Sequence, residues 1–240
     1  MSFIKALSRG LLTAVALVAV NVSAQVSNVE GLTPLEGVVI PKVNQPQTAK
    51  PGVVFKDCEE CPEMVVIPQD INQISFAIGK YETTQKQWIF IMGSNPSKNI
   101  GSTLPVENVS WDDATEYLRK LSIKTGRKYR LPSDAEWVFA AGVKSSYQSF
   151  ANEIDKYGWV GSNSELQTHA VGLKKPNQYG LYDLVGNVWE WVQDCKNDCT
   201  YRIQKGGSYL APNDVDIRGW SFNYQNKKEP TSGLRVARDL

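Results

Sequence analysis

The stretch that decides the fold is Gly180–Trp191, which reads Gly-Leu-Tyr-Asp-Leu-Val-Gly-Asn-Val-Trp-Glu-Trp. It places two carboxylates, Asp183 and Glu190, seven positions apart, with Gly186 between them. Calcium binds several oxygens from carboxylates and backbone carbonyls on irregular loops. Glycine adopts backbone conformations that a side chain forbids, so a turn here can aim the carbonyls of Gly186 and Val188 at a cation. The stretch predicts either a calcium loop or a capped loop whose tryptophans fill a core.

The same stretch resembles the signature of the formylglycine-generating enzyme (sulfatase-modifying factor) family. Other motifs of that family follow in its order, and the match extends from about Phe55 to the C-terminus, so residues 55–240 are identified as one domain of the family. These motifs are Cys61–Pro68, Ile78–Gln85, Pro105–Asp113, Tyr129–Trp137, Lys205–Tyr209 and Gly233–Arg238.

The resemblance implies an α+β fold, a C-type lectin-like variant of the formylglycine-generating enzyme type. Such a domain is rich in loops and has small sheets and about three helices. In the family, the central loop binds calcium through positions that match Asp183, Gly186, Val188 and Glu190 here. Calcium is therefore the expected cofactor.

The C-terminal segment separates this chain from the family's enzymes, which oxidise a substrate cysteine to formylglycine with copper and oxygen. Those enzymes use two cysteines shortly after the Gly-Gly-Ser motif, and ungapped alignment puts these positions at about Asp216 and Ser221. Neither residue is a thiol, and no cysteine follows Cys199. Because Cu(I) selects soft thiolate ligands, copper is not an expected cofactor. The resemblance therefore favours a non-catalytic domain, and the alternative is an oxidative enzyme of the family with different chemistry.

The N-terminus predicts export. Met1–Ala24 has a basic start with Lys5 and Arg9, an apolar run at Leu11–Val20 and a small-residue cleavage site, as a signal peptide does. Residues 25–54 are rich in proline and poor in charge, which predicts a flexible linker. The expected location is periplasmic or secreted, in a bacterium.

The composition limits the classes of partner that the chain is expected to bind. The chain has 240 residues and a formal net charge of +1, so no charge excess points to nucleic acid or an anionic membrane surface. No stretch after the signal peptide is apolar and long enough to cross a bilayer.

The four cysteines form two close pairs, Cys58 with Cys61 and Cys195 with Cys199. In an oxidising compartment four cysteines predict two disulfides with three possible connectivities. A zinc site and a redox-active Cys-x-x-Cys are the alternatives.

Three helices are expected after the caps Thr84, Ser110 and Ser133, each followed three residues later by an amide or carboxylate side chain. The second is predicted to run from Trp111 to about Thr125 and to stop at Gly126, because glycine favours the left-handed conformation that ends helices. The acids in these motifs are better explained as caps than as catalytic groups.

A candidate partner surface follows the Gly-Gly-Ser motif and consists of Asp214, Asp216, Trp220, Phe222 and Tyr224. Aromatic residues among small polar ones are typical of recognition surfaces. The alternation of the three aromatics is equally typical of a half-buried strand, so both interpretations stand. The expected partner is a periplasmic protein that this chain matures, assists or inhibits.

One histidine and three arginines are the remaining candidate functional residues. His169 is the only histidine, so a histidine triad for iron is excluded, and a structural role before a strand at Ala170–Val171 is expected. Arg218, Arg235 and Arg238 are expected to tie loops together through buried carboxylates or carbonyls.

Overall fold

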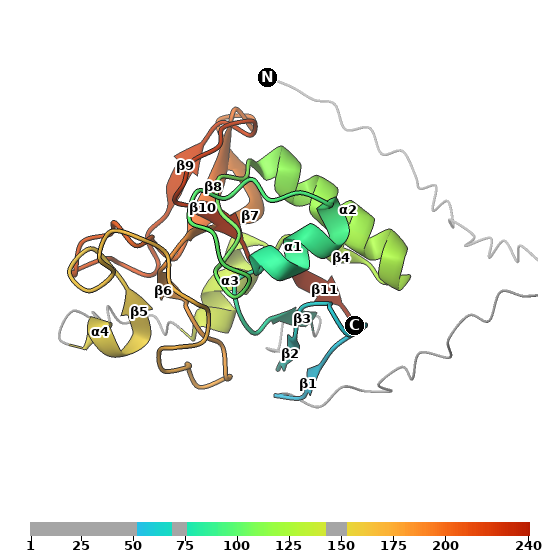
Figure 1. Ribbon diagram of the computed structural model, residues 1–240, viewed down its shortest axis with the longest axis horizontal. Coiled ribbons are helices and arrows are strands. Elements are labelled where there is room, and N and C mark those ends of the chain that lie inside the picture. The colour runs from blue at the N-terminus through green and yellow to red at the C-terminus, as the bar shows by residue number, and fades with distance from the viewer. Residues whose placement is uncertain (1–51, 69–75, 143–152) are drawn as a thin grey trace, which may run out of the picture. The chain divides into compact units, whose positions relative to one another are not determined.

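The computed structural model describes residues 52–68, 76–142 and 153–240 (Figure 1). The predicted signal peptide 1–24 and nearly all of the linker 25–54 lie outside the described residues. No helix among the described residues is both long and apolar enough to span a membrane.

One sheet joins the two ends of the domain. Its order is β1-β2-β3-β11-β4, and every neighbouring pair is antiparallel. The last strand lies between two early ones, since Ala237 pairs with both Ile78 and Arg130. The strands are β1 (Val54–Phe55), β2 (Met64–Ile67), β3 (Phe76–Gly79), β4 (Tyr129–Arg130) and β11 (Ala237–Asp239).

A second sheet, of order β10-β7-β8-β9, carries the central stretch. Its longest pairing is the antiparallel hairpin of β7 and β8, β10 runs parallel to β7, and β9 forms one edge. A short parallel pair, β5 with β6, lies beside the turn at Gly186. The strands are β5 (Gly158–Trp159), β6 (Val185–Gly186), β7 (Trp189–Lys196), β8 (Tyr201–Lys205), β9 (Ser221–Asn223) and β10 (Ser232–Leu234).

The three predicted helices are confirmed, each with a complete capping box at its start and a left-handed glycine at its end. They are α1 (Gln85–Met92), α2 (Trp111–Thr125) and α3 (Asp134–Ala141), and a single turn, α4 (Ile154–Tyr157), follows. The fold is thus α+β, with small sheets connected by long loops.

Two apolar clusters lie on opposite faces of the first sheet. One holds α3 through Trp137 and takes in Ile78 and Val192, and the other holds α2 through Tyr117 and takes in Ala77 and Trp191. Alternating residues of β3 and β7 therefore contribute to different clusters, as the two-residue period of a strand requires. Figure 1 shows α2 running beside β4, with α3 nearer the centre.

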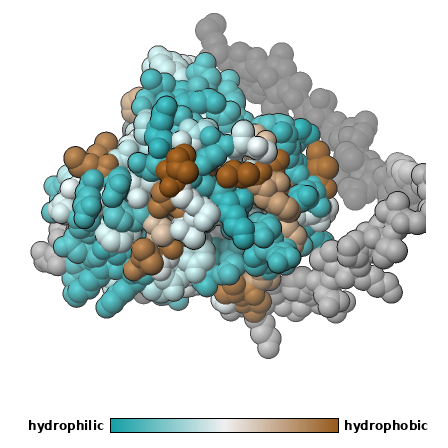
Figure 2. Space-filling view, viewed as in Figure 1, coloured by the Kyte–Doolittle hydropathy of each residue, from teal (hydrophilic) through white to brown (hydrophobic). Residues whose placement is uncertain are grey.

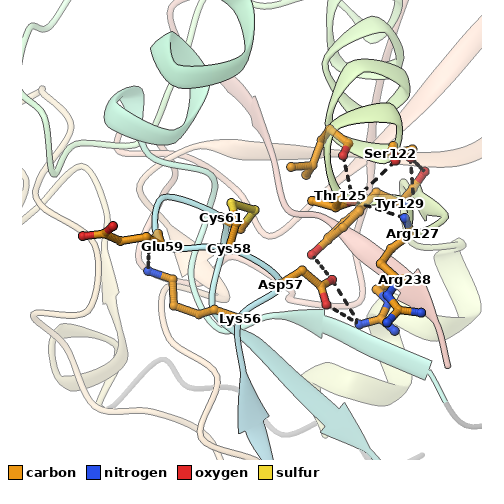
Figure 3. Close-up of a disulfide and its surroundings, with 11 residues drawn as sticks. Lys56, Asp57, Cys58, Glu59, Cys61, Ser122, Thr125, Arg127, Tyr129 and Arg238 are labelled. Carbon is orange, nitrogen blue, oxygen red and sulfur yellow. Dashed lines mark hydrogen bonds and ion pairs between the residues drawn. A yellow bond between two sulfur atoms is a disulfide. The ribbon is translucent and has the colours of Figure 1, made fainter. Parts of the chain in front are cut away.

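Both disulfides are local, Cys58 with Cys61 and Cys195 with Cys199. All four thiols are used, so the zinc alternative is wrong. Near the first disulfide, Asp57 accepts hydrogen bonds from the Tyr129 hydroxyl (2.6 Å) and the Arg238 guanidinium (3.1 Å), which ties the N-terminal loop to β4 and β11 (Figure 3).

The strand predicted at Ala170–Val171 is wrong. The chain turns there, with Gly172 at φ +79°. The His169 ring stacks on the Trp159 indole with centroids 3.8 Å apart and contacts the Ser164 carbonyl at 2.8 Å. The segment is therefore a packed loop, held by ring stacking and a turn and not by strand-to-strand hydrogen bonds.

Candidate functional site

The central loop is a strained turn that requires glycine. Gly186 has φ +77°, and a Cβ there would lie 2.0 Å from the Trp159 carbonyl oxygen. Asp183 and Asn187 also have positive φ, 55° and 54°. The predicted backbone freedom at Gly186 is therefore used, and any side chain would push β5 and β6 apart.

Glu190 lies at the centre of a buried hydrogen-bond network. Its carboxylate accepts two bonds from Arg235 Nε, each 3.0 Å, and one of 2.6 Å from Arg235 Nη2. The Trp137 indole donates a further bond of 2.5 Å. Arg235 also donates to the carbonyls of Gly79 and Tyr182, at 2.9 and 2.8 Å. The prediction that this arginine ties loops together is confirmed.

Glu82 is a member of the site that the sequence analysis did not single out. It is fully buried, and its two oxygens accept bonds from the Val188 amide (3.0 Å) and the Asn187 side chain (2.7 Å). Burial raises the pKa of Glu82 well above its usual value, and the charges of Asp183 and Glu190 raise it further. An acid between an apolar strand and a helix cap was the available signal, but its spacing does not show what it faces.

Asp183 is only half satisfied. One carboxylate oxygen accepts a 2.7 Å bond from the Gly172 amide, and the other, Oδ1, is buried without a partner among the described residues. Burial raises the pKa of Asp183 to about 6, although the Gly172 bond and the Arg235 charge act in the opposite direction.

These groups are short of positive charge. Three carboxylates, Glu82, Asp183 and Glu190, act on one buried guanidinium, and the Lys174 ammonium also acts on Asp183, so negative charge is in excess when all three acids are ionised. Uncompensated charge in a protein interior is costly, and protons or a cation must offset it. The orphaned Asp183 oxygen fits a cation, but no three acidic, histidine or cysteine side chains in the described residues gather as a metal site. Calcium would therefore also need backbone oxygens, such as the carbonyls of Gly186 and Val188.

The Gly-Gly-Ser turn connects this loop to the candidate partner surface. The Gly186 amide donates to the Gly206 carbonyl (2.9 Å), and the Tyr209 amide donates to the Asn187 carbonyl (2.8 Å). Ser208 then lines a surface groove of about 560 Å³. The groove is also lined by Trp189, Leu210, Ala211, Pro212, Asp214, Val215, Asp216, Gly219, Trp220 and Thr231.

Three predicted surface residues are exposed: Trp220 by 44%, Phe222 by 49% and Tyr224 by 52%. The predicted strand is present as β9, but Phe222 is on its exposed side, so the expectation that these aromatics fill the core is wrong. Tyr201 of β8 stands against Phe222 and Tyr224, with ring centroids 5.2 and 4.9 Å away. We call Tyr201, Trp220, Phe222 and Tyr224 the aromatic strip.

The strip borders the groove, because Trp220 belongs to both. Asp216 pairs with Arg218 at 3.4 Å, and both Asp214 and Asp216 are exposed. Figure 2 shows that hydrophobic residues on the face viewed there are scattered in small patches among hydrophilic ones. The sequence-predicted surface residues are therefore brought together, and the loop residues form a separate buried group.

Small sheets joined by long loops, with a buried acidic loop packed on a Gly-Gly-Ser turn, define a domain of the formylglycine-generating enzyme type. The sequence pattern of the sulfatase-modifying factor enzyme 1-like domain matches residues 50–240, and the chain belongs to this family.

Its relatives include proteins named as enzymes, one named as an inactive enzyme and one named as a chaperone. The chain is 33% identical over 230 residues to the chaperone protein LppX of Paenibacillus barcinonensis, covering 71% of this chain and 82% of that one. It is 30% identical to the formylglycine-generating enzyme of Streptomyces coelicolor, covering 73% and 67%. It is 36% identical to the inactive C-alpha-formylglycine-generating enzyme 2 of Bos taurus, covering 50% and 44%.

Among solved structures, Treponema denticola variable protein 1 has a similar fold, with a TM-score of 0.70 and 26% identity. The similarity covers 78% of this chain and 99% of that one.

Replacing Arg235 by methionine tests the buried network. The variant keeps most of the volume but leaves Glu190 buried without its counter-charge, so we expect a loss of about 3–5 kcal/mol in the free energy of unfolding. Denaturant unfolding followed by circular dichroism measures it. The control is Arg119→Met, which removes an exposed i,i+3 pair with Glu116 and should have no measurable effect. Equal stability of the two variants would contradict the role of Arg235.

Proposed function

We propose that this protein is an exported, non-catalytic member of its family that binds a protein partner as a maturation, assisting or inhibitory factor. The observation that carries the proposal is the aromatic strip, which is exposed beside the groove at the Gly-Gly-Ser turn. Exposed aromatic side chains held by their neighbours give large contact areas with little loss of conformational entropy, and such residues dominate binding energies.

The rings of the strip support one another before any partner arrives. Trp220 lies 5.6 Å from Phe222, centroid to centroid, and the Lys196 ammonium lies 3.0 Å from the centre of the Trp220 ring. The Tyr201 and Tyr224 hydroxyls are 3.3 Å apart. Pre-organised surfaces bind more tightly because less freedom is lost on association.

The relatives favour the same function. One carries the name of a chaperone and another that of an inactive enzyme. All four cysteines of this chain are in disulfides, so no thiol is left for copper. Two disulfides also suit an oxidising, extracytoplasmic location.

Binding is tested with tagged residues 25–240 in an affinity pull-down from the periplasm or medium of the source bacterium, followed by calorimetry with the purified partner. We expect a stoichiometric partner and a dissociation constant at least about 30-fold weaker for Trp220→Ala, because buried aromatic anchors contribute about 2 kcal/mol or more. The control is Ile123→Ala, which removes an exposed apolar side chain on α2. Unchanged affinity for Trp220→Ala and Tyr224→Ala would contradict the proposed surface.

The absence of catalysis is tested with a Cys-x-Pro-x-Arg peptide, copper and oxygen. We expect the peptide mass to stay constant with this protein and to change with the Streptomyces coelicolor enzyme as the positive control. Conversion by this protein would favour the alternative, an oxidative enzyme with different chemistry.

We further propose that calcium binds at Asp183 and Glu190, together with the carbonyls of Gly186 and Val188, and that Glu190 gives up part of its hydrogen bonding to Arg235 when calcium binds. The support is the buried Asp183 Oδ1 and the uncompensated negative charge around it. Bound calcium would hold the loop in place by charge.

Calcium at about 100 times its dissociation constant should stabilise the fold by about 2.7 kcal/mol, which raises the melting temperature by roughly 5–10 °C. Chelator should reverse the shift, and Asp183→Asn should remove most of it. Identical melting temperatures with calcium and with chelator would rule out the site.

A further inference from the structure

The tip of the β7–β8 hairpin is a strained loop closed by an exposed disulfide. Asn197, Asp198 and Cys199 have φ of 50°, 53° and 66°, so three consecutive residues other than glycine adopt the left-handed conformation. This region is sparsely populated by residues with a side chain. The disulfide with Cys195 closes the loop, and the Thr200 amide donates to the Asn197 carbonyl at 3.0 Å.

Of the two residues next to this loop, Tyr201 belongs to the aromatic strip and Lys196 contacts it. Lys196 and Tyr201 pair directly across the hairpin, immediately before and after the loop. The Lys196 ammonium packs on Trp220, and the Tyr201 ring packs on Phe222 and Tyr224. The hairpin tip is therefore in direct contact with the strip.

The two disulfides differ in access. Cys199 is exposed and Cys195 half-buried, whereas Cys58 is half-buried and Cys61 is 1% exposed. Thiol–disulfide exchange requires a thiolate to reach a sulfur, and exposed disulfides in strained loops are the ones that react. The disulfide at the hairpin tip therefore has an exposed cysteine for a thiolate to attack, and the one in the N-terminal loop has none.

We propose that Cys195–Cys199 is a reducible disulfide that positions the aromatic strip, and that the reductant is a dithiol. The consequence for recognition rests on the proposed function. One thiolate of the dithiol attacks Cys199 Sγ, the S–S bond breaks and Cys195 leaves as a thiolate that takes up a proton. The second thiol of the reductant then displaces Cys199 from the mixed disulfide, so the chain gains two thiols and the reductant becomes a disulfide. Once the disulfide is reduced, the loop relaxes from its left-handed conformation, and Lys196 and Tyr201 shift.

Selective reduction is tested on the folded, full-length protein with graded dithiothreitol, followed by alkylation and peptide mass mapping. We expect Cys195 and Cys199 to be alkylated at reductant concentrations at least about tenfold below those needed for Cys58 and Cys61. Equal susceptibility of the two pairs, or earlier reduction of Cys58 and Cys61, would overturn the proposal.

The positioning role is tested by amide hydrogen exchange on the selectively reduced protein. Exchange should accelerate several-fold at residues 196–204 and 221–224 and remain unchanged in α2. The double variant Cys195→Ser/Cys199→Ser should show the same pattern, whereas the matched Cys58→Ser/Cys61→Ser should leave exchange at residues 221–224 unchanged. Unaltered exchange at 221–224 after reduction would overturn the positioning role. These measurements need no partner, so their failure is distinct from failure of the binding proposal.

Discussion

The ion pair between Arg235 and Glu190 connects the two sheets. Arg235 lies between β10, in the second sheet, and β11, in the first. Its guanidinium reaches Gly79 at the end of β3 and Glu190 in β7, so one side chain binds both sheets. The desolvation of two buried charges offsets much of their attraction, and we infer that the pair acts mainly by fixing geometry. A methionine of similar size would fill the space without specifying which carbonyls lie around it.

The charge of this network explains why the central loop is shaped as it is. Glu82 accepts bonds from the loop at Asn187 and Val188, and Asp183 accepts one from Gly172. Each acid therefore stabilises a backbone that glycine and left-handed residues make strained. The raised pKa values of Glu82 and Asp183 mark the same cause, burial that Arg235 alone does not compensate. Protonation and binding of the proposed calcium are two ways to remove the same excess charge.

Local features of the fold could be predicted from the sequence, and long-range ones could not. The helices after Thr84, Ser110 and Ser133 follow from caps whose partners are three residues away. The turn at Gly186 follows from glycine itself. The contacts of Glu82 with Asn187 and of Arg235 with Glu190 join positions 105 and 45 residues apart, and no periodicity encodes them. The wrong strand at Ala170–Val171 has the same origin, because the Trp159–His169 stacking that shapes the segment comes from a different part of the chain.

Strand β7 connects the buried charged network to the exposed aromatic strip. Glu190 near its start is buried in the charged network, and Lys196 at its end touches the exposed Trp220. On β8, Ile203 packs into the core while Tyr201, two residues earlier and on the same face, belongs to the exposed strip. The strip is thus the outer continuation of a core-forming sheet face that no described element covers. Exposed aromatic surface promotes association, so this face of the sheet is the surface to which the proposed partner would bind.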